Sequence, residues 1–149
     1  MGVLVKGVFQ MSKIWFGAFV VAALTSLPAA AGAEGRVPLP EEQHINEQLI
    51  AAAGGDLIRN NCPAISARML VVLGKMSDLK SYAEGKGYTE AEVKVFLKDK
   101  DQKARVKGAA TAYLASQGAV DGDSESYCKV GRAEIANGTL LGSLIREQG

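Results

Sequence analysis

The stretch Pro63–Leu79, PAISARMLVVLGKMSDL, carries the longest apolar stripe of the chain at helical spacing. Proline at its start suits the first turn of a helix. The apolar side chains that follow recur every three or four residues, at Ile65, Met69, Val72, Leu73, Met76 and Leu79. A helix with such a stripe buries it against its neighbours. The sequence therefore predicts that this stretch is the central core helix of the domain.

Shorter helical patterns flank this stretch on both sides. They are expected over residues 40–61, 89–97, 100–117, 124–136 and 140–145. Thr89 and Glu92 have the spacing of a capping box, which places a helix start between them. Alternating runs of β-branched residues, which would indicate strands, are missing. The predicted fold class is all-α, a small orthogonal bundle of four to six helices.

The two cysteines, Cys62 and Cys128, are predicted to form one disulfide. An even number of cysteines in an exported chain is typical of paired thiols, and this bridge would close a loop of about 67 residues. The alternatives are a redox dithiol or a metal site. A redox dithiol usually has the Cys-x-x-Cys spacing, and a zinc site needs three or four ligands, whereas the chain offers only His44 besides the cysteines. Both alternatives are therefore disfavoured.

The first 33 residues have the pattern of a secretory signal peptide. Lys6 and Lys13 precede an uncharged apolar run over residues 14–27, which is too short for a membrane span and long enough for a signal-peptide core. Small residues follow, so cleavage is expected after Ala33 or after Ala31. The alternative is an uncleaved membrane anchor. Cleavage would leave no transmembrane segment and would place the protein in the periplasm.

Cleavage would divide the chain into a signal peptide, residues 1–33, a flexible lead-in, residues 34–39, and a single helical domain, residues 40–149. The lead-in is polar, contains one proline, Pro38, and has nothing to bury. Removing two lysines lowers the formal net charge from +1 to −1. A nearly neutral chain lacks the net basic face that binding to nucleic acid or to an anionic membrane requires.

Two clusters of charge resemble binding sites. Asp121, Asp123 and Glu125 occupy positions 1, 3 and 5 of a calcium loop, but Ser126 and Arg132 stand where that loop needs glycine and an acid. We expect an acidic turn that caps the next helix. A basic cluster follows Thr89, and we expect it to be a solvated helix surface, with a docking patch for an acidic partner as the alternative. Its members are Lys94, Lys98, Lys100, Lys103, Arg105 and Lys107.

His44 is the only histidine and lies in the first turns of an expected helix. No serine or cysteine nucleophile with a matched base and a third orienting group can be assigned, so no catalytic residue is predicted. No cofactor or metal ligand is predicted either. The alternative is a small hydrolase or ligand-binding enzyme that uses His44 with a nearby carboxylate, Glu41 or Glu47.

Four polar residues are retained as a candidate functional cluster. Arg68 lies on the predicted core helix, and Arg132 and Glu134 lie close to Cys128 in the sequence, so these three side chains could meet in an internal ion network. They could equally be exposed and contribute little to stability. With His44 they form the candidate polar cluster.

Several segments resemble one family that is known only as a domain of unknown function. Its members are small exported proteins of alphaproteobacteria of the Rhodobacterales type, and the resemblance covers residues 38–146. It rests mainly on Asn61-Cys62-Pro63 occurring together with Tyr127-Cys128 and Gly131-Arg132. The resemblance implies a periplasmic location, a bridge between the two cysteine segments, and no catalytic residues. Members are encoded near genes for respiratory complex I, which implies an accessory role at the cell envelope.

Two classes of function follow. The favoured one is a noncatalytic binding or accessory protein of the periplasm, with a periplasmic or inner-membrane partner, which includes a respiratory complex of that membrane. An exposed groove would favour it if it were lined by Met69, Met76, Tyr82 or Tyr113. The alternative is the small enzyme, and a deep hollow that gathered His44, Arg68 and Glu134 would favour it. The sequence does not determine the oligomeric state.

Overall fold

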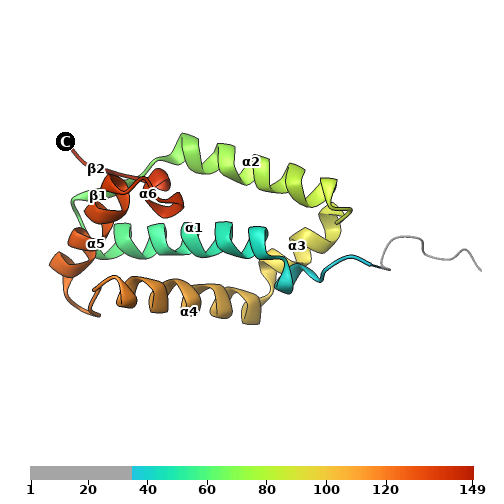
Figure 1. Cartoon of the computed structure of the whole chain (residues 1–149), viewed down its shortest axis with the longest axis horizontal. Coiled ribbons are helices and arrows are strands. Elements are labelled where there is room, and N and C mark those ends of the chain that lie inside the picture. The colour runs from blue at the N-terminus through green and yellow to red at the C-terminus, as the bar shows by residue number, and fades with distance from the viewer. Residues whose placement is uncertain (1–34) are drawn as a thin grey trace, which may run out of the picture. The chain divides into compact units, whose positions relative to one another are not determined.

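A computed structural model of the chain describes residues 35–149. These residues form six α-helices, one turn of 3-10 helix and a small antiparallel sheet (Figure 1). The elements in chain order are η1 (Leu39–Glu41), α1 (Gln43–Asn61), β1 (Ile65–Ala67), α2 (Met69–Gly85), α3 (Glu90–Lys98), α4 (Lys100–Ser116), α5 (Ser124–Ala136), α6 (Leu140–Leu144) and β2 (Ile145–Glu147). The prediction of an all-α fold with four to six helices and one disulfide is confirmed.

Side-chain caps set the starts of most helices. The Thr89 hydroxyl accepts a hydrogen bond from the Glu92 amide while the Glu92 carboxylate accepts one from the Thr89 amide, so the predicted capping box of α3 is confirmed. The Asp99 carboxylate caps α4 by accepting from the Gln102 amide, and the Asp123 carboxylate caps α5 by accepting from the amides of Glu125 and Ser126. The acidic turn before α5 therefore serves as a helix cap, as the sequence indicates.

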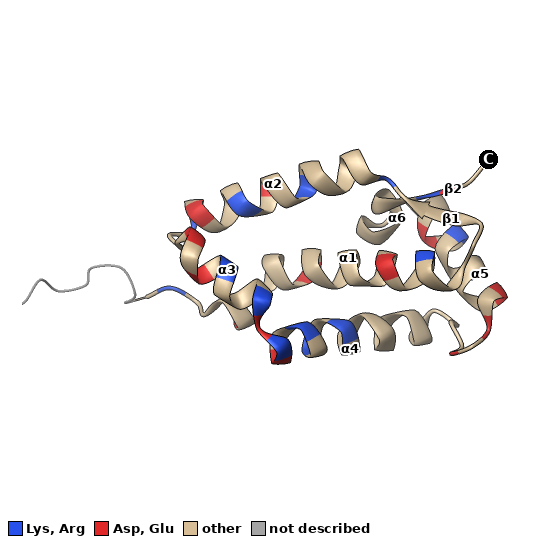
Figure 2. Cartoon of the chain, turned by 180° about the vertical axis from the view of Figure 1, so that it is seen from behind, with Lys and Arg blue, Asp and Glu red and all other residues tan. Residues whose placement is uncertain are grey.

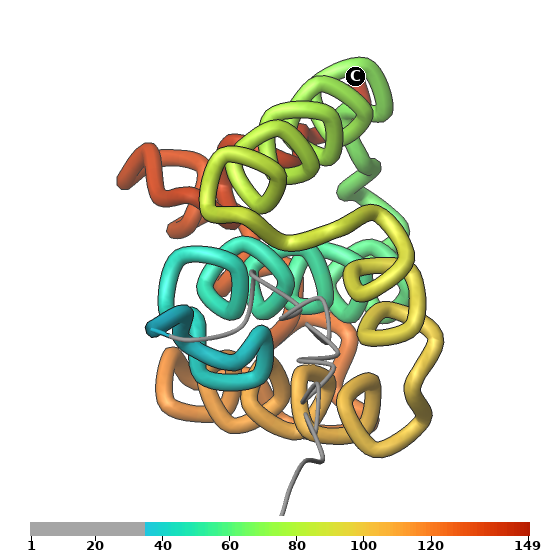
Figure 3. The backbone as a smooth tube through the Cα atoms, turned by 90° about the vertical axis from the view of Figure 1, so that its right-hand side faces the viewer, coloured from blue at the N-terminus to red at the C-terminus, as the bar shows by residue number. Residues whose placement is uncertain are grey.

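Helix α1 occupies the centre of the domain. It lies between α2 and α4, and α5 and α6 pack against it (Figures 1 and 3). The prediction that the stretch 63–79 forms the central core helix is wrong. Residues 65–67 form strand β1, and α2, which begins only at Met69, has a single buried residue, Ala83. Helix α1 has five: Ile45, Ala51, Gly54, Gly55 and Ile58.

Small residues explain why α1 is central. A Cβ atom added at Gly54 would lie 2.6 Å from Cδ1 of Leu141, so the missing side chain is what lets α6 pack directly on α1. Glycine and alanine contribute little to an apolar stripe in the sequence. They nevertheless allow neighbouring helices to approach from more than one side, because the packing distance depends on side-chain size. The hydropathy of the sequence therefore favours α2 as the central helix, whereas close packing favours α1 for that position.

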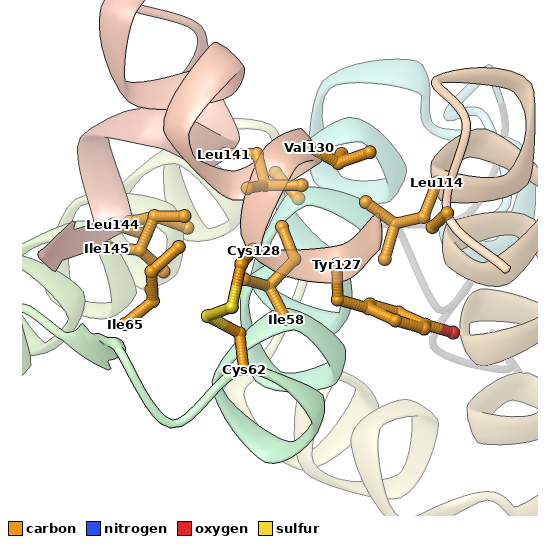
Figure 4. Close-up of a cluster of buried hydrophobic side chains, with 12 residues drawn as sticks. Ile58, Cys62, Ile65, Leu114, Tyr127, Cys128, Val130, Leu141, Leu144 and Ile145 are labelled. Atoms are coloured by element: carbon orange, nitrogen blue, oxygen red, sulfur yellow. A yellow bond between two sulfur atoms is a disulfide. The ribbon is translucent and has the colours of Figure 1, made fainter. Parts of the chain in front are cut away.

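The main core lies at the C-terminal end of α1, where α4, α5, α6 and both strands meet (Figure 4). The sulfur atoms of Cys62 and Cys128 lie at bonding distance and the two Cα atoms are 5.1 Å apart, which confirms the predicted pair. The buried residues of this core are Ala51, Ile58, Cys62, Ile65, Leu114, Ala119, Tyr127, Cys128, Val130, Leu141, Leu144 and Ile145. The disulfide therefore joins α5 to the end of α1 inside the main core.

Two three-residue strands close this end of the domain. Strand β1 pairs antiparallel with β2, and Ser66 lies opposite Arg146 at the middle of the ladder. The expectation that the chain contains no strand is therefore wrong for these two segments. Segments this short carry no alternating pattern, and they pair because the domain brings them together across more than 75 residues of sequence.

A second, smaller core lies at the other end of α1. Its buried residues are Leu39, Ile45, Ala83, Tyr88 and Phe96. Leu79, Tyr82 and Val93 pack against it without being fully buried. This core holds the C-terminal half of α2 and the whole of α3 against the start of α1.

The segment before α1 contacts this second core. Arg36 forms an ion pair with Glu92 at 2.5 Å, and its guanidinium lies 4.5 Å from the centroid of the Tyr88 ring. Leu39 is buried, so the expectation that the lead-in has nothing to bury is wrong at this residue. Its flexibility stays a prediction. The predicted signal peptide, residues 1–33, lies outside the described residues.

None of the helices within residues 35–149 combines the length and the apolar character that a membrane crossing requires.

Candidate interaction surface

Four large apolar side chains stand out from the first half of α2. Met69, Leu70, Leu73 and Met76 have exposed fractions of 59%, 85%, 57% and 60%. At 100° per residue they fall within an arc of about 120° of the helix, so they form one face. We call these four residues the α2 apolar face. Large apolar side chains gathered on one exposed helix face usually mark an interaction site.

The opposite side of α2 explains why this face points outward. Val71 and Val72 pack against the main core, and Leu79 and Tyr82 pack against the second core. The helix is apolar on more of its circumference than α1 and its neighbours can cover. The first turns of α2 carry no charged residue after Arg68, as Figure 2 shows. The α2 apolar face is therefore the part of the apolar surface of α2 that the rest of the described domain leaves uncovered.

A hollow of about 400 Å³ between α2 and α3 continues the α2 apolar face beyond Met76. Its apolar lining comes from Met76, Val93 and Leu97. At its rim the Lys80 ammonium pairs with two carboxylates, Glu84 at 3.9 Å and Glu90 at 3.4 Å. The hollow thus offers an apolar floor next to charged groups.

Two lysines on the rim of this hollow have no such partner. Lys94 and Lys98 line the hollow, and within residues 35–149 no carboxylate lies at ion-pair distance from either ammonium. Both belong to the basic cluster predicted from the sequence, whose other members lie exposed on α4 (Figure 2). Part of that cluster therefore borders the apolar surface.

His44 and Arg68 lie at different ends of the domain. The exposed His44 is in the first turn of α1, and its ring lies 4.3 Å from the Tyr82 ring, centroid to centroid. Arg68 precedes α2, next to the strand that follows α1, and its guanidinium donates a hydrogen bond to the Ser143 carbonyl at 3.3 Å. The whole length of α1 separates the two side chains (Figure 1).

Arg132 and Glu134 lie two residues apart on α5 and have different surroundings. The exposed Arg132 pairs with Glu125 at 3.5 Å and with Glu147 at 2.9 Å. Glu134 is buried, and its carboxylate accepts hydrogen bonds from the hydroxyls of Tyr113 and Thr139. The structure therefore does not join the four residues of the candidate polar cluster into one site, and the hydrolase alternative stays a prediction.

A sequence model of one protein family matches residues 37–146, which is most of the chain. That family is described as a family of unknown function, DUF5333. The chain belongs to this family. The resemblance noted in the sequence, which covers residues 38–146, is therefore confirmed at the level of a family of unknown function. No curated protein and no solved structure matches this DUF5333 chain.

One polar contact of this DUF5333 chain was missed in the sequence. The Glu42 carboxylate caps α1 by accepting from the Ile45 amide at 2.7 Å, and it also accepts from the Tyr82 hydroxyl of α2 at 2.8 Å. The cap has a signal in the sequence, an acid just before a helix, but the contact with Tyr82 has none. Glu42 is thus a polar link between α1 and α2.

The environment of this link shifts two pKa values. Partial burial raises the pKa of Glu42, but the hydrogen bonds from Ile45 and Tyr82 and the positive charges of His44 and Lys86 outweigh it, so the pKa lies below its usual value. The hydrogen bond to Glu42 raises the pKa of Tyr82, with burial adding to the effect. Both shifts favour the hydrogen-bonded state, in which Glu42 is ionised and Tyr82 is neutral.

Proposed function

We propose that this DUF5333 protein is a noncatalytic binding protein of the periplasm, and that the α2 apolar face is where its partner docks. The observation that carries the proposal is the exposure of Met69, Leu70, Leu73 and Met76 on one helix. Covering them with a partner would remove apolar surface from water, which stabilises a complex by about 25 cal/mol for each Å². The side chains of Met69 and Met76 adapt to partners of different shape because methionine is unbranched.

The surface also indicates the chemistry of the partner. The hollow beside the α2 apolar face combines an apolar floor with the ammonium groups of Lys94 and Lys98, which pair with no carboxylate of residues 35–149. An amphipathic helix with acidic residues beside its apolar stripe would complement both features. The proposed partner is such a helix in a periplasmic or inner-membrane protein.

Two finer parts of the proposal rest on the sequence. The pattern of residues 1–33 supports export, and an exported location agrees with a buried disulfide pair. The resemblance of the chain to exported proteins encoded near genes for respiratory complex I supports a respiratory complex of the inner membrane as the partner.

Affinity capture with matched variants tests the docking surface. The tagged mature protein is used as bait on periplasm and solubilised inner membrane, beside a variant with Leu70→Ser and Leu73→Ser. The control is Val120→Ser, which alters an apolar residue that is 56% exposed in the loop after α4. We expect a partner that is retained by the wild type and by the control, and lost by the α2 variant.

The outcomes separate the parts of the proposal. Subunits of a respiratory complex among the proteins lost by the α2 variant would support the finer assignment. Equal capture by all three baits would contradict the docking surface. Binding to anionic lipid vesicles that only the α2 variant loses would identify a membrane in place of a protein and would also contradict it.

A fractionation experiment tests export. Amino-terminal sequencing of the protein from the periplasm should begin at residue 34 or 32, and thiol labelling of the unfolded, unreduced protein should find no free thiol. An intact N-terminus with two reactive thiols in the cytosol would contradict both export and the disulfide.

A further inference from the structure

Within residues 35–149, Glu134 is the one charged residue that is buried, with an exposed fraction of 4%. One carboxylate oxygen, Oε1, accepts a hydrogen bond from the Tyr113 hydroxyl at 2.7 Å, and the other, Oε2, accepts one from the Thr139 hydroxyl. A carboxylate has about four acceptor positions, so two hydroxyl donors leave part of its capacity free. Glu134 is therefore held in place without being saturated.

The charge of Glu134 has no counter-ion in the described part of the chain. No lysine, arginine or histidine there lies at ion-pair distance from its carboxylate. Glu134 is also in the last turn of α5, where the helix dipole disfavours a negative charge. A buried charge without a partner is costly, so a cation that reached Glu134 would be bound favourably.

A hollow of about 310 Å³ has Glu134 and both of its hydroxyl partners, Tyr113 and Thr139, among its lining residues. It is lined by Glu47, Ile50, Ala51, Tyr113, Glu134, Thr139, Leu140 and Leu141. The lining contains two carboxylates and no basic side chain, and its other walls are mostly apolar. The volume is at the lower end of the range for small-molecule sites. The hollow thus combines two acidic residues with apolar walls.

We propose that this hollow binds a small organic ammonium ion, with Glu134 as its counter-ion and the side chains of Ile50, Leu140 and Leu141 against its apolar part. The Tyr113 ring lies at the same hollow and adds a surface that attracts cations. Within residues 35–149 no group of three or more His, Cys, Asp or Glu is placed to hold a metal ion. The apolar walls suit the carbon chain of an amine and would not suit a hydrated metal ion.

The Tyr113 hydroxyl that contacts Glu134 has a raised pKa. The hydrogen bond to the Glu134 carboxylate raises the pKa of the Tyr113 hydroxyl, and burial and the negative charge add to the effect. The hydroxyl therefore stays neutral at neutral pH, donates a hydrogen bond to the Glu134 carboxylate and adds no charge to the hollow.

Glu134 also has a structural role, which the experiment has to separate from binding. Its hydroxyl partners lie on α4 and at the start of α6, and the Thr139 hydroxyl accepts from the Gly142 amide at 2.9 Å. Glu134→Gln keeps the shape and most of the hydrogen bonds and removes the charge. Glu47→Lys alters an exposed residue at the rim and adds a tethered ammonium group that competes for the hollow.

Titration calorimetry of the mature protein with n-pentylammonium chloride tests the proposal. Neutral n-pentanol and the anion pentanoate serve as ligand controls. We expect millimolar or tighter binding of the ammonium ion, weaker binding of n-pentanol, and no binding of pentanoate. Both variants should bind the ammonium ion about tenfold more weakly or not at all, because Glu134→Gln removes the counter-ion and Glu47→Lys places a competing, repelling ammonium group at the hollow.

Three outcomes would overturn the proposal. They are no heat of binding for n-pentylammonium at millimolar concentration, equal binding of n-pentanol, and unchanged binding by Glu47→Lys. Far-ultraviolet circular dichroism shows whether each variant is folded. If Glu134→Gln does not fold, Glu47→Lys alone decides the result, because its side chain is exposed and lies outside both cores.

Discussion

Helices α6 and α2 both pack against α1, and they differ in how well they fit it. Three of the five residues of α6 are buried, whereas α2 has one buried residue among its seventeen. Helix α6 approaches α1 closely because Gly54 of α1 has no side chain in the way, and Gly142 of α6 lets the same helix approach the backbone of α5 at Glu134. Helix α2 carries larger apolar residues and meets α1 with fewer of them. Burial in this protein therefore follows the fit between surfaces more closely than it follows hydropathy.

This difference separates the part of the domain that provides stability from the part that we propose binds a partner. The main core, the disulfide and the sheet hold one end of the domain together, so α2 can leave apolar surface exposed without loss of the fold. Stability should therefore be concentrated in the main core, and substitutions on the exposed side of α2 should affect it little.

Removing the disulfide should have the largest effect. In the variant Cys62→Ala with Cys128→Ala, the unfolded chain regains the freedom of a loop closed over a separation of 66 residues. We expect a loss of about 4 kcal/mol in the free energy of unfolding, measured by urea denaturation. An unchanged urea midpoint would contradict a stabilising bridge in the main core.

Equal truncations on α1 and α2 should differ in cost. Ile58→Ala empties a fully buried position of the main core and should cost about 3 kcal/mol. Leu73→Ala, on the α2 apolar face, should change stability by less than about 0.5 kcal/mol. Chemical denaturation of both variants measures the difference. Similar losses would show that α2 is as much a part of the core as α1.

The same glycine substitution should have opposite signs on α5 and α2. A Cβ atom at Gly131 would meet Cδ1 of Ile65 and would lie 2.8 Å from Cγ2 of Ile58, so Gly131→Ala should cost about 1–3 kcal/mol. Gly74 is inside α2 with no atom in reach of an added Cβ, so Gly74→Ala should stabilise the protein by up to about 1 kcal/mol. Thermal unfolding compares the two variants. A destabilised Gly74→Ala variant would indicate that another part of the domain packs against α2 at Gly74.

The smallest effect concerns the polar link between α1 and α2. Glu42→Ala removes a helix cap and the acceptor of the Tyr82 hydroxyl, and should cost about 1 kcal/mol at neutral pH. The pKa of Glu42 is lowered in the folded state, so its contribution is complete above the unfolded value of about 4.3 and is lost as the pH falls through the folded value.

Unfolding curves of wild type and variant at a series of pH values should therefore converge in acid. The matched control is Glu41→Ala, which removes a neighbouring exposed carboxylate and leaves both contacts of Glu42 in place. A constant difference in the free energy of unfolding between the wild type and Glu42→Ala at all pH values would show that the effect does not depend on the charge of Glu42.

Local chemistry made several features predictable. The capping box of Thr89 and Glu92, the Asp123 cap and the boundaries of most helices depend on residues that are neighbours in the chain. The cysteine pair could be predicted because the sequence has two cysteines, so each has a single possible partner. Glu134 was singled out in the sequence, but its neighbours Tyr113 and Thr139 were not predicted to meet it, because their contact depends on the packing of three helices.

The sequence by itself determined the helical class, the starts of α3, α4 and α5 and the disulfide, since each depends on local spacing or on a count. The tertiary structure alone decided that α1 is central, that two three-residue segments pair as strands, and that a carboxylate is buried beside a hollow. These features depend on which surfaces fit together in three dimensions, and the close packing that glycines allow leaves almost no trace in the hydropathy of a sequence.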